Sequence, residues 1–259
     1  MEVPMMQARN RRKEVMATLK HQKTVYVKDL ADSLEVSDMT IRRDLHRLAD
    51  LGMVTLIHGG AVLNEGTATL DSVRARATRM SKEKSAIAAR CAGLVKEGNA
   101  VYLDTGTTVM EIAEALKMRQ NIAVLTHSLP ICNILANSEK IQFISMPGIY
   151  NPTLKGFVGD MTCRMIRSFR IDIAFLGISS IDLDTGIMTP DFHDQAVKIA
   201  LTERASRKVV ACDHSKIGHV SFAQVCPLNA VDMIVTDKMA DKDFLRRAER
   251  MGVEVVAVG

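Results

Sequence analysis

Hydrophobic positions recur at helical spacing in three short segments near the N-terminus. These positions are Val15 and Leu19, then Leu30, Ala31 and Leu34, then Ile41, Leu45 and Leu48. One apolar face per segment predicts three helices. Short breaks at residues 21–24 and 35–37 separate them, and Ser37 is suited to accept a backbone N–H as N-cap of the third helix. The close spacing of the second and third helices is that of a helix-turn-helix.

Two apolar segments follow the third helix. Met53–Ile57 and Ala61–Leu63 flank His58-Gly59-Gly60, and this pattern predicts two antiparallel strands joined by a glycine turn. Three helices followed by a strand pair form a winged helix-turn-helix, which we assign to residues 1–63. Periodicity is lost over residues 64–80, which we interpret as a linker.

Helical segments alternate with strand-length apolar segments from residue 81 onward. The apolar segments are Val101–Leu103, Ile122–Leu125, Ile141–Ile144, Ile173–Leu176, Val209–Ala211, Met233–Val235 and Val253–Val258. Strands that are apolar on both faces and separated by helices are typical of a parallel sheet covered on both sides. The sequence therefore predicts an α/β protein, in which the winged helix-turn-helix joins a doubly wound, mostly parallel α/β domain over residues 81–259.

Composition narrows the class of protein. The apolar segments are too short to cross a membrane, and the start does not resemble a signal peptide, so we expect a cytoplasmic protein with no membrane partner. Five widely spaced cysteines argue against a disulfide framework or structural zinc. The net charge of +4 permits nucleic-acid binding without indicating it. We predict no cofactor.

The third helix carries a group of basic and polar side chains outside its apolar stripe. A helix of this kind fits the major groove of double-stranded DNA, where Arg can give two hydrogen bonds to guanine and Thr can reach bases or phosphates. Asp44 is expected to position Arg43 or the helix, because phosphate repels a carboxylate. The alternative is that the arginines form an ordinary solvent-exposed face with no binding role, and that Asp38, Asp44 and Asp50 balance their charge. The predicted DNA-binding residues, with His58 in the wing, are Ser37, Asp38, Met39, Thr40, Arg42, Arg43, Arg47 and His58.

A second candidate site follows the first strand of the α/β domain. Asp104-Thr105-Gly106-Thr107-Thr108 leads into a helix, where glycine permits a tight turn and a helix N-terminus attracts anions. The same residues also serve simply as helix caps. Polar groups end other strands, and such ends converge in an open parallel sheet. The predicted effector-binding residues are Asp104, Gly106, Thr107, Thr108, Thr126, His127, Lys198 and Lys216.

Both halves of the chain resemble the DeoR family of bacterial transcription factors. Ser37 to Leu45 follow its pattern Ser-x-x-Thr-hydrophobic-Arg-Arg-Asp-Leu, and residues 84–237 resemble its effector domain through Asp-Thr-Gly-Thr-Thr, Thr-His-Ser, Asp-His-Ser-Lys and the turns at Gly177 and Gly186. The resemblance implies a repressor of a sugar-metabolism operon that binds repeated operator half-sites as a homo-oligomer, a dimer or tetramer. It also implies a phosphorylated sugar as effector, because this domain is related to ribose-5-phosphate isomerase and coenzyme A transferases.

The chain departs from the family pattern at two positions. Gln195-Ala196 stands where the family often has Glu followed by Ala, and His127 stands where it usually has Asn. We expect Gln195 to remove a negative charge from the effector pocket, and both departures to bear on effector preference.

A sugar-phosphate isomerase-like enzyme carrying an accessory DNA-binding module is the alternative. Acid and base candidates are Asp104, Asp182, Asp191, Asp194, Lys198 and Asp213. However, Gly177–Ser180 replace the isomerase pattern Asp-Gly-Ala-Asp, and its Lys-Gly-Gly-Gly loop is missing around Met188–Pro190. We therefore predict a regulator with no catalytic residues. A metal site at Asp191, His193 and Asp194, or at His214 and His219, has too few ligands, so we predict no metal.

Overall fold

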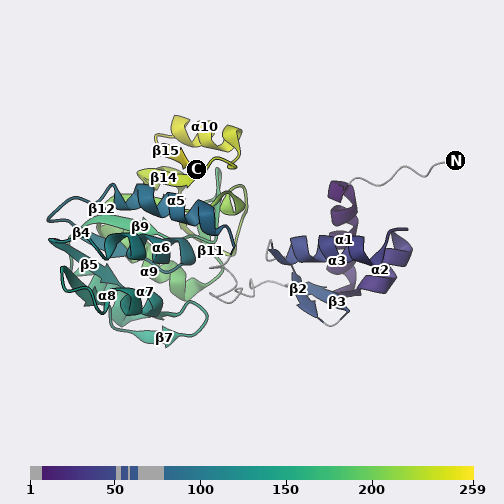
Figure 1. The fold of residues 1–259 in the computed structure, drawn as a ribbon, viewed down its shortest axis with the longest axis horizontal. Coiled ribbons are helices and arrows are strands. Elements are labelled where there is room, and N and C mark those ends of the chain that lie inside the picture. Colours follow the sequence, from purple (N-terminus) through teal and green to yellow (C-terminus); the bar gives the residue numbers. More distant parts are fainter. Residues whose placement is uncertain (1–7, 51–53, 58, 64–78) are drawn as a thin grey trace. The chain divides into compact units, whose positions relative to one another are not determined.

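The computed structural model describes residues 8–50, 54–57, 59–63 and 79–259 (Figure 1). The chain divides into two compact units, Met1–Leu70 and Asp71–Gly259. The division falls within the segment that the sequence predicts as a linker. Among the described helices, none is long and apolar enough to span a bilayer.

The N-terminal unit contains the three predicted helices, α1 (Ala8–Gln22), α2 (Val27–Ser33) and α3 (Asp38–Asp50). Their predicted apolar stripes form one core, in which Val15, Leu19, Ile41 and Leu45 are almost fully buried. Ser37 precedes α3, and its hydroxyl accepts the backbone N–H of Thr40 at 3.3 Å. The predicted helices and cap are therefore confirmed.

A three-stranded antiparallel sheet completes this unit. Strands β2 (Val54–Ile57) and β3 (Gly60–Leu63) form the predicted hairpin. A further strand, β1 (Thr24–Tyr26), pairs with β3 on its other side. The sequence analysis placed this segment partly in a helix break, since three residues are too few to show strand periodicity. His58 of the predicted wing lies outside the described residues.

Asp44 holds α1 against α3. Its buried carboxylate accepts hydrogen bonds from Arg11 at 2.5 Å and from Arg12 at 3.2 Å. Of the two roles expected for Asp44, positioning the helix is therefore confirmed and positioning Arg43 is not, because its partners Arg11 and Arg12 lie on α1. Consecutive residues on a helix point in different directions, so Arg43 remains exposed while Asp44 faces the core.

The second unit is built on a parallel sheet of seven strands in the order β15-β14-β12-β9-β4-β5-β6. All seven correspond to predicted strand segments, so the predicted doubly wound α/β class is confirmed. In chain order these strands are β4 (Ala100–Leu103), β5 (Ile122–Thr126), β6 (Ile141–Ser145), β9 (Ile171–Leu176), β12 (Ala205–Ala211), β14 (Met233–Asp237) and β15 (Glu254–Val258).

Helices cover both faces of this sheet (Figure 1). Helices α5 (Ser81–Ala92), α6 (Thr107–Leu116) and α7 (Leu129–Leu135) pack with alternate sheet residues into one apolar core. On the other face, α8 (Asp160–Arg167) packs against α9 (Phe192–Arg204), and α9 contacts β9 and β12. Residues that alternate in β4, such as Val101 and Tyr102, are therefore both fully buried.

Several short elements lie outside the main sheet, and of these only α10, between β14 and β15, was predicted, as one of the helices that alternate with strands. Strands β10, β11 and β13 form an antiparallel sheet, and β7 pairs with β8 in a hairpin. Helix α10 precedes β15, and two 3₁₀ helices flank β13. These elements are β7 (Ile149–Asn151), β8 (Gly156–Val158), β10 (Ser180–Asp182), β11 (Gly186–Thr189), β13 (Ala223–Cys226), α10 (Lys242–Arg250), η1 (His214–Lys216) and η2 (Leu228–Ala230).

Gly177 allows the ends of β9 and β4 to approach closely. A methyl group added to Gly177 would lie 2.0 Å from the carbonyl oxygen of Thr105. We expect Gly177→Ala to force the two turns apart and to lower the free energy of unfolding by about 1–3 kcal/mol. Denaturant unfolding checks this value. The control is Gly93→Ala, where the methyl group would lie 3.3 Å from the Arg90 carbonyl oxygen; equal losses in both variants would contradict the close-approach argument.

Candidate functional site

Helix α3 presents the predicted DNA-binding side chains to solvent. Ser37, Asp38, Arg42, Arg43 and Arg47 are exposed, and Thr40 is partly exposed. Met39 is also 67% exposed, which is unusual for a large apolar side chain on a helix that has its own buried face. The structure thus leaves this group of side chains free of the core, and their contacts with DNA remain a prediction.

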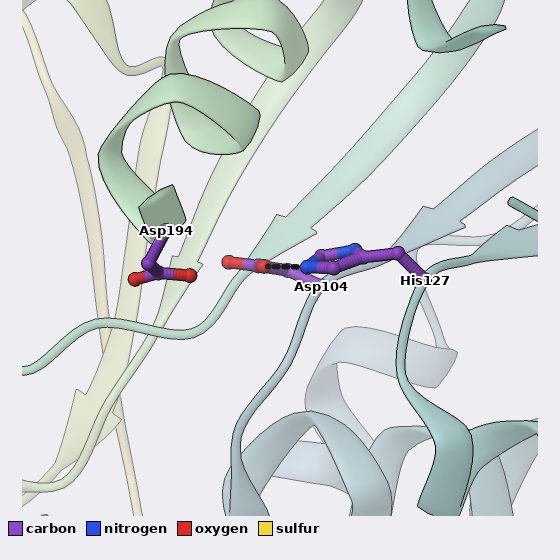
Figure 2. A group of neighbouring side chains, drawn as sticks. All are labelled: Asp104, His127 and Asp194. Atoms are coloured by element: carbon purple, nitrogen blue, oxygen red, sulfur yellow. Dashed lines mark ion pairs between the residues drawn. The ribbon is translucent and has the colours of Figure 1, made fainter. Parts of the chain in front are cut away.

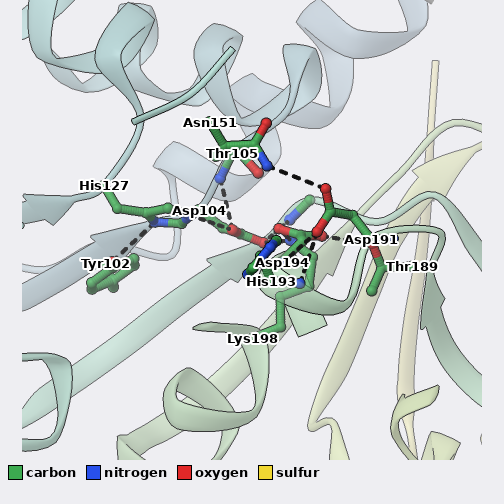
Figure 3. Close-up of polar contacts among 11 residues, drawn as sticks. Tyr102, Asp104, Thr105, His127, Asn151, Thr189, Asp191, His193, Asp194 and Lys198 are labelled. Carbon is green, nitrogen blue, oxygen red and sulfur yellow. Dashed lines mark hydrogen bonds and ion pairs between the residues drawn. The ribbon is translucent and has the colours of Figure 1, made fainter. Parts of the chain in front are cut away.

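Asp104 is at the centre of the second candidate site. It directly follows β4 and is fully buried. One carboxylate oxygen accepts the backbone N–H of Thr105 at 2.7 Å, and the other accepts the backbone N–H of Gly177 at 3.0 Å (Figure 3). Burial raises the pKa of Asp104 to about 6, and the attraction of Lys198 opposes part of that rise. The carboxylate is therefore held in place by two turns at adjacent strand ends.

Lys198 brings a buried positive charge to this carboxylate. Its Nζ lies 2.5 Å from Asp104 Oδ2 and 3.0 Å from Asp194 Oδ1. Burial lowers the pKa of Lys198, but the two carboxylates more than compensate and hold it above its usual value. Asp194 and Lys198 lie four residues apart on α9, so both point toward the strand ends. Asp194 also accepts the hydroxyl of Thr189 at 2.7 Å.

His127 follows β5 and is fully buried beside Asp104. Its Nδ1 lies 3.0 Å from the hydroxyl of Tyr102, and its Nε2 lies 3.7 Å from Asp104 Oδ1 (Figure 2). Burial, helped by the charge of Lys198, lowers the pKa of His127 to about 3. The imidazole is therefore neutral at physiological pH, and 3.7 Å is too long for a hydrogen bond.

The turn after Asp104 has the geometry predicted for an anion site. Gly106 has a φ of +124°, a conformation that favours glycine, and helix α6 begins at Thr107. The N–H groups of a helix's first turn lack partners within the helix and attract negative charge. Among the described residues, the hydroxyls of Thr107 and Thr108 have no hydrogen-bond partner. Both hydroxyls thus lack a partner within the described residues, although each threonine is only 8% exposed.

Two predicted effector residues, Thr126 and Lys216, form no hydrogen bond or ion pair with Asp104, His127 or Lys198 among the described residues. Thr126 is fully buried, and its hydroxyl donates to the Leu103 carbonyl at 2.6 Å and accepts the N–H of Ser128 at 3.0 Å. Its hydroxyl therefore serves to join the ends of β4 and β5. Lys216 is partly exposed in η1, and within the described residues its ammonium has no carboxylate partner. The structure brings together Asp104, His127 and Lys198.

Gln195 does not take the place that the sequence analysis expected. Its side-chain amide donates to the Gln224 carbonyl in β13 at 2.6 Å, so it faces the smaller sheet. Asp194, one residue earlier, supplies the carboxylate instead. The expectation that Gln195 removes a negative charge from the pocket is therefore wrong. The four-residue spacing of Asp194 and Lys198 was the sequence signal for this pair.

The carboxylates and His127 do not form a convincing metal site. Ligand atoms of Asp104, His127 and Asp194 lie within 4.8 Å of one another (Figure 2). However, the ammonium of Lys198 already contacts both carboxylates. A metal ion bound by both carboxylates would have to displace this buried cation. Lys198 therefore supplies the positive charge that a metal would otherwise bring.

A cavity of about 490 Å³ lies elsewhere, between α8 and α9. None of the predicted effector residues is among its lining residues, which are Gly159, Asp160, Cys163, Arg167, Phe192, His193, Ala196 and Ile199. This cavity is separate from the buried cluster at the strand ends.

We expect Lys198→Met to destabilise the second unit strongly, because it leaves two buried carboxylates without their cation. Removing one partner of a buried ion pair costs about 3–5 kcal/mol. The loss should be smaller at pH 5 than at pH 8, because burial raises the pKa of Asp104 to about 6 and its protonation relieves the repulsion. Denaturant unfolding at both pH values measures it. The control is Lys117→Met, which removes an exposed pair with Glu114 and should cost less than about 1 kcal/mol. A pH-independent loss would contradict this account.

Comparisons of sequence identify both halves of the chain. Residues 11–67 match the DeoR-like helix-turn-helix domain, and residues 79–238 match the DeoR C terminal sensor domain. The chain also resembles a solved structure, that of ribose 5-phosphate isomerase A from Methanocaldococcus jannaschii. That likeness covers 53% of this chain and 54% of the isomerase, at 20% identity and a TM-score of 0.40, which is too weak to bear on activity.

Curated relatives match along nearly the whole chain. The glycerol-3-phosphate regulon repressor of Escherichia coli is 31% identical over 90% of this chain and 92% of its own length. The transcriptional repressor AccR of Agrobacterium fabrum is 33% identical over 88% and 89%, and the HTH-type transcriptional repressor GlcR of Bacillus subtilis is 28% identical over 93% of each. All three are named as regulators rather than enzymes, which confirms the prediction of a regulator. The chain belongs to the DeoR family of transcriptional regulators.

Proposed function

We propose that this chain is a cytoplasmic transcriptional repressor whose binding to operator DNA is controlled by a phosphorylated sugar. The observation that carries the proposal is the exposed basic face of α3, presented by a helix-turn-helix in a chain of the DeoR family. The relative from Escherichia coli is named as a repressor of the glycerol-3-phosphate regulon, which supports a phosphorylated polyol or sugar as the signal and a sugar-metabolism operon as the target.

In this proposal α3 lies in the major groove of double-stranded DNA. Its N-terminal residues Asp38, Met39 and Thr40 face base edges, and its arginines contact guanine or phosphate. The hairpin of β2 and β3, with His58 at its turn, follows the neighbouring backbone. Asp44 does not meet DNA, because its carboxylate is buried against Arg11 and Arg12.

The effector phosphate is proposed to bind at the N-terminus of α6. Gly106 gives close access to the backbone, and the hydroxyls of Thr107 and Thr108 donate to phosphate oxygens. The rest of the effector then lies toward Asp104, His127 and Lys198, which follow or face adjacent strand ends. Thr126 supports the turn through its two internal hydrogen bonds, and Lys216 adds long-range positive charge.

The proposed organisation has three parts, a DNA-binding domain at residues 1–63, a linker at 64–80 and an effector-binding domain at 81–259. A dimer or tetramer would present several winged helices to repeated half-sites. Effector binding changes DNA affinity only if the effector prefers one arrangement of the protein over the other.

We expect Arg42→Ala and Arg43→Ala each to weaken operator binding by about 10- to 100-fold, because each removes a contact worth about 1–3 kcal/mol. The operator is first found by binding-site selection on genomic DNA with the full chain. Fluorescence anisotropy at fixed salt then gives the affinities. The control is Arg164→Ala, which changes an exposed arginine of α8. Unchanged affinity in both test variants would refute the docking of α3.

We expect Thr107→Ala to weaken the response to the effector about tenfold, since it removes one hydrogen bond to a charged phosphate. The measurement is the concentration of each of several sugar phosphates that shifts operator binding by half. Thr153→Ala, on the exposed hairpin turn, is the control and should respond like the unmodified chain. If Thr107→Ala responded as the unmodified chain does, the proposal that phosphate binds at the N-terminus of α6 would be wrong. The DNA-binding proposal would be unaffected.

A further inference from the structure

The buried ring of His127 has one nitrogen with no partner. Nδ1 is paired with the hydroxyl of Tyr102 at 3.0 Å. In the part of the chain that the structure describes, Nε2 is buried and makes no hydrogen bond, although it points toward Asp104 (Figure 3). A buried polar atom without a partner costs about 1–3 kcal/mol, so its presence needs a reason.

The surroundings make this nitrogen a hydrogen-bond donor. A neutral imidazole carries one proton, and the partner of the other nitrogen decides where it sits. Burial raises the pKa of Tyr102 well above its usual value, so the tyrosine keeps its proton and can donate it to Nδ1. The proton of the ring then lies on Nε2, facing the carboxylate of Asp104 at 3.7 Å, where a lone pair would be repelled.

The backbone of His127 and one edge of its ring pack against the hairpin of β7 and β8. The backbone N–H of Phe157 in β8 donates to the His127 carbonyl at 2.8 Å. Gly156, next to it, packs so closely that an added methyl group would lie 3.4 Å from Cδ2 of the ring and 2.9 Å from Cγ2 of Thr105. The hairpin of β7 and β8 therefore fixes His127 beside the turn that leads into α6.

We propose that His127 determines effector specificity, by donating its Nε2 proton to an uncharged oxygen of the effector while the phosphate lies at the N-terminus of α6. This inference rests on the proposed function, and it assigns the choice among phosphorylated ligands to one residue. A hydroxyl group suits the position best, because it can accept from Nε2 and donate to Asp104 at the same time. The effector is thus a phosphorylated polyol or sugar.

Phosphorylated carboxylic acids are excluded by the same geometry. The cluster contains two carboxylates, Asp104 and Asp194, against one ammonium, Lys198. A third carboxylate beside Asp104 would be buried next to a like charge, which is strongly unfavourable. A phosphorylated acid of similar size should therefore bind no better than inorganic phosphate.

Two substitutions distinguish the contributions of the two ring nitrogens of His127. His127→Asn places an amide where Nδ1 lies and retains the contact with Tyr102, but it has no atom at the position of Nε2. His127→Gln reaches the position of Nε2. The probes are glycerol 3-phosphate, ribose 5-phosphate, glucose 6-phosphate, 3-phosphoglycerate and inorganic phosphate, each titrated into the full chain by calorimetry.

We expect at least one polyol or sugar phosphate to bind the unmodified chain more tightly than 3-phosphoglycerate or inorganic phosphate. His127→Asn should weaken that binding about tenfold and leave inorganic phosphate unaffected, and His127→Gln should restore part of the loss. Without ligand, His127→Asn should not unfold at a lower temperature, because it removes an unpaired buried donor.

The possible failures can be told apart. Equal sugar-phosphate binding by the unmodified chain and by His127→Asn would overturn the role of His127 and leave the proposed function standing. A lower unfolding temperature for ligand-free His127→Asn with unchanged affinity would assign the ring a purely structural role. Equally tight binding of 3-phosphoglycerate would overturn the ligand class. If the unmodified chain bound none of these phosphate esters, both this inference and the proposed effector would fail.

Discussion

The buried ammonium of Lys198, shared between Asp104 and Asp194, is the interaction on which the second unit depends. Removing these charges from water is costly, and only their mutual pairing and the hydrogen bonds around them offset that cost. Asp104 also accepts two backbone N–H groups, and Asp194 accepts Thr189. The pairing therefore fixes α9 against the ends of β4 and β9, and the positions of the surrounding turns follow from it.

Two groups of this cluster, Lys198 and His127, are each held in one protonation state at neutral pH, whereas burial raises the pKa of Asp104 to about 6. A general base must lose its proton near neutral pH, but Lys198 is held protonated by two carboxylates. His127 is held neutral, with a pKa of about 3, so it cannot exchange protons at that pH either. What the cluster offers is a fixed set of donors and acceptors. Such a set can distinguish ligands by their hydrogen bonds, as a sensor requires.

The sequence predicted the main sheet better than its surroundings. The strands β4, β9 and β14 are buried on both faces, and each of the seven parallel strands contains an apolar segment that the sequence shows clearly. Strands such as β7 and β10 are three residues long, and β7 is largely exposed, so no pattern marks them. Because strand ends converge in a parallel sheet, the sequence predicted that Asp104 and Lys198 share one site, although 94 positions separate them. The sequence offered Asp194 only as an acid–base or metal-ligand candidate and not as an effector residue, and it did not reveal Tyr102, whose hydroxyl acts through His127.

The hairpin of β7 and β8 links the proposed effector site to the start of α9. Its strand β8 packs on His127, and Asn151 in its strand β7 donates to Asp191 at 3.3 Å. Asp191 in turn caps α9 by accepting the N–H groups of His193 and Asp194. A ligand that pairs with the His127 ring therefore contacts the residue whose backbone carbonyl binds the hairpin. The hairpin in turn contacts the N-cap of α9, the helix that carries Asp194 and Lys198. Because shifts at one end of such a packed network are not absorbed locally, differential binding at His127 and Asp104 has a physical route to the outer surface of α9.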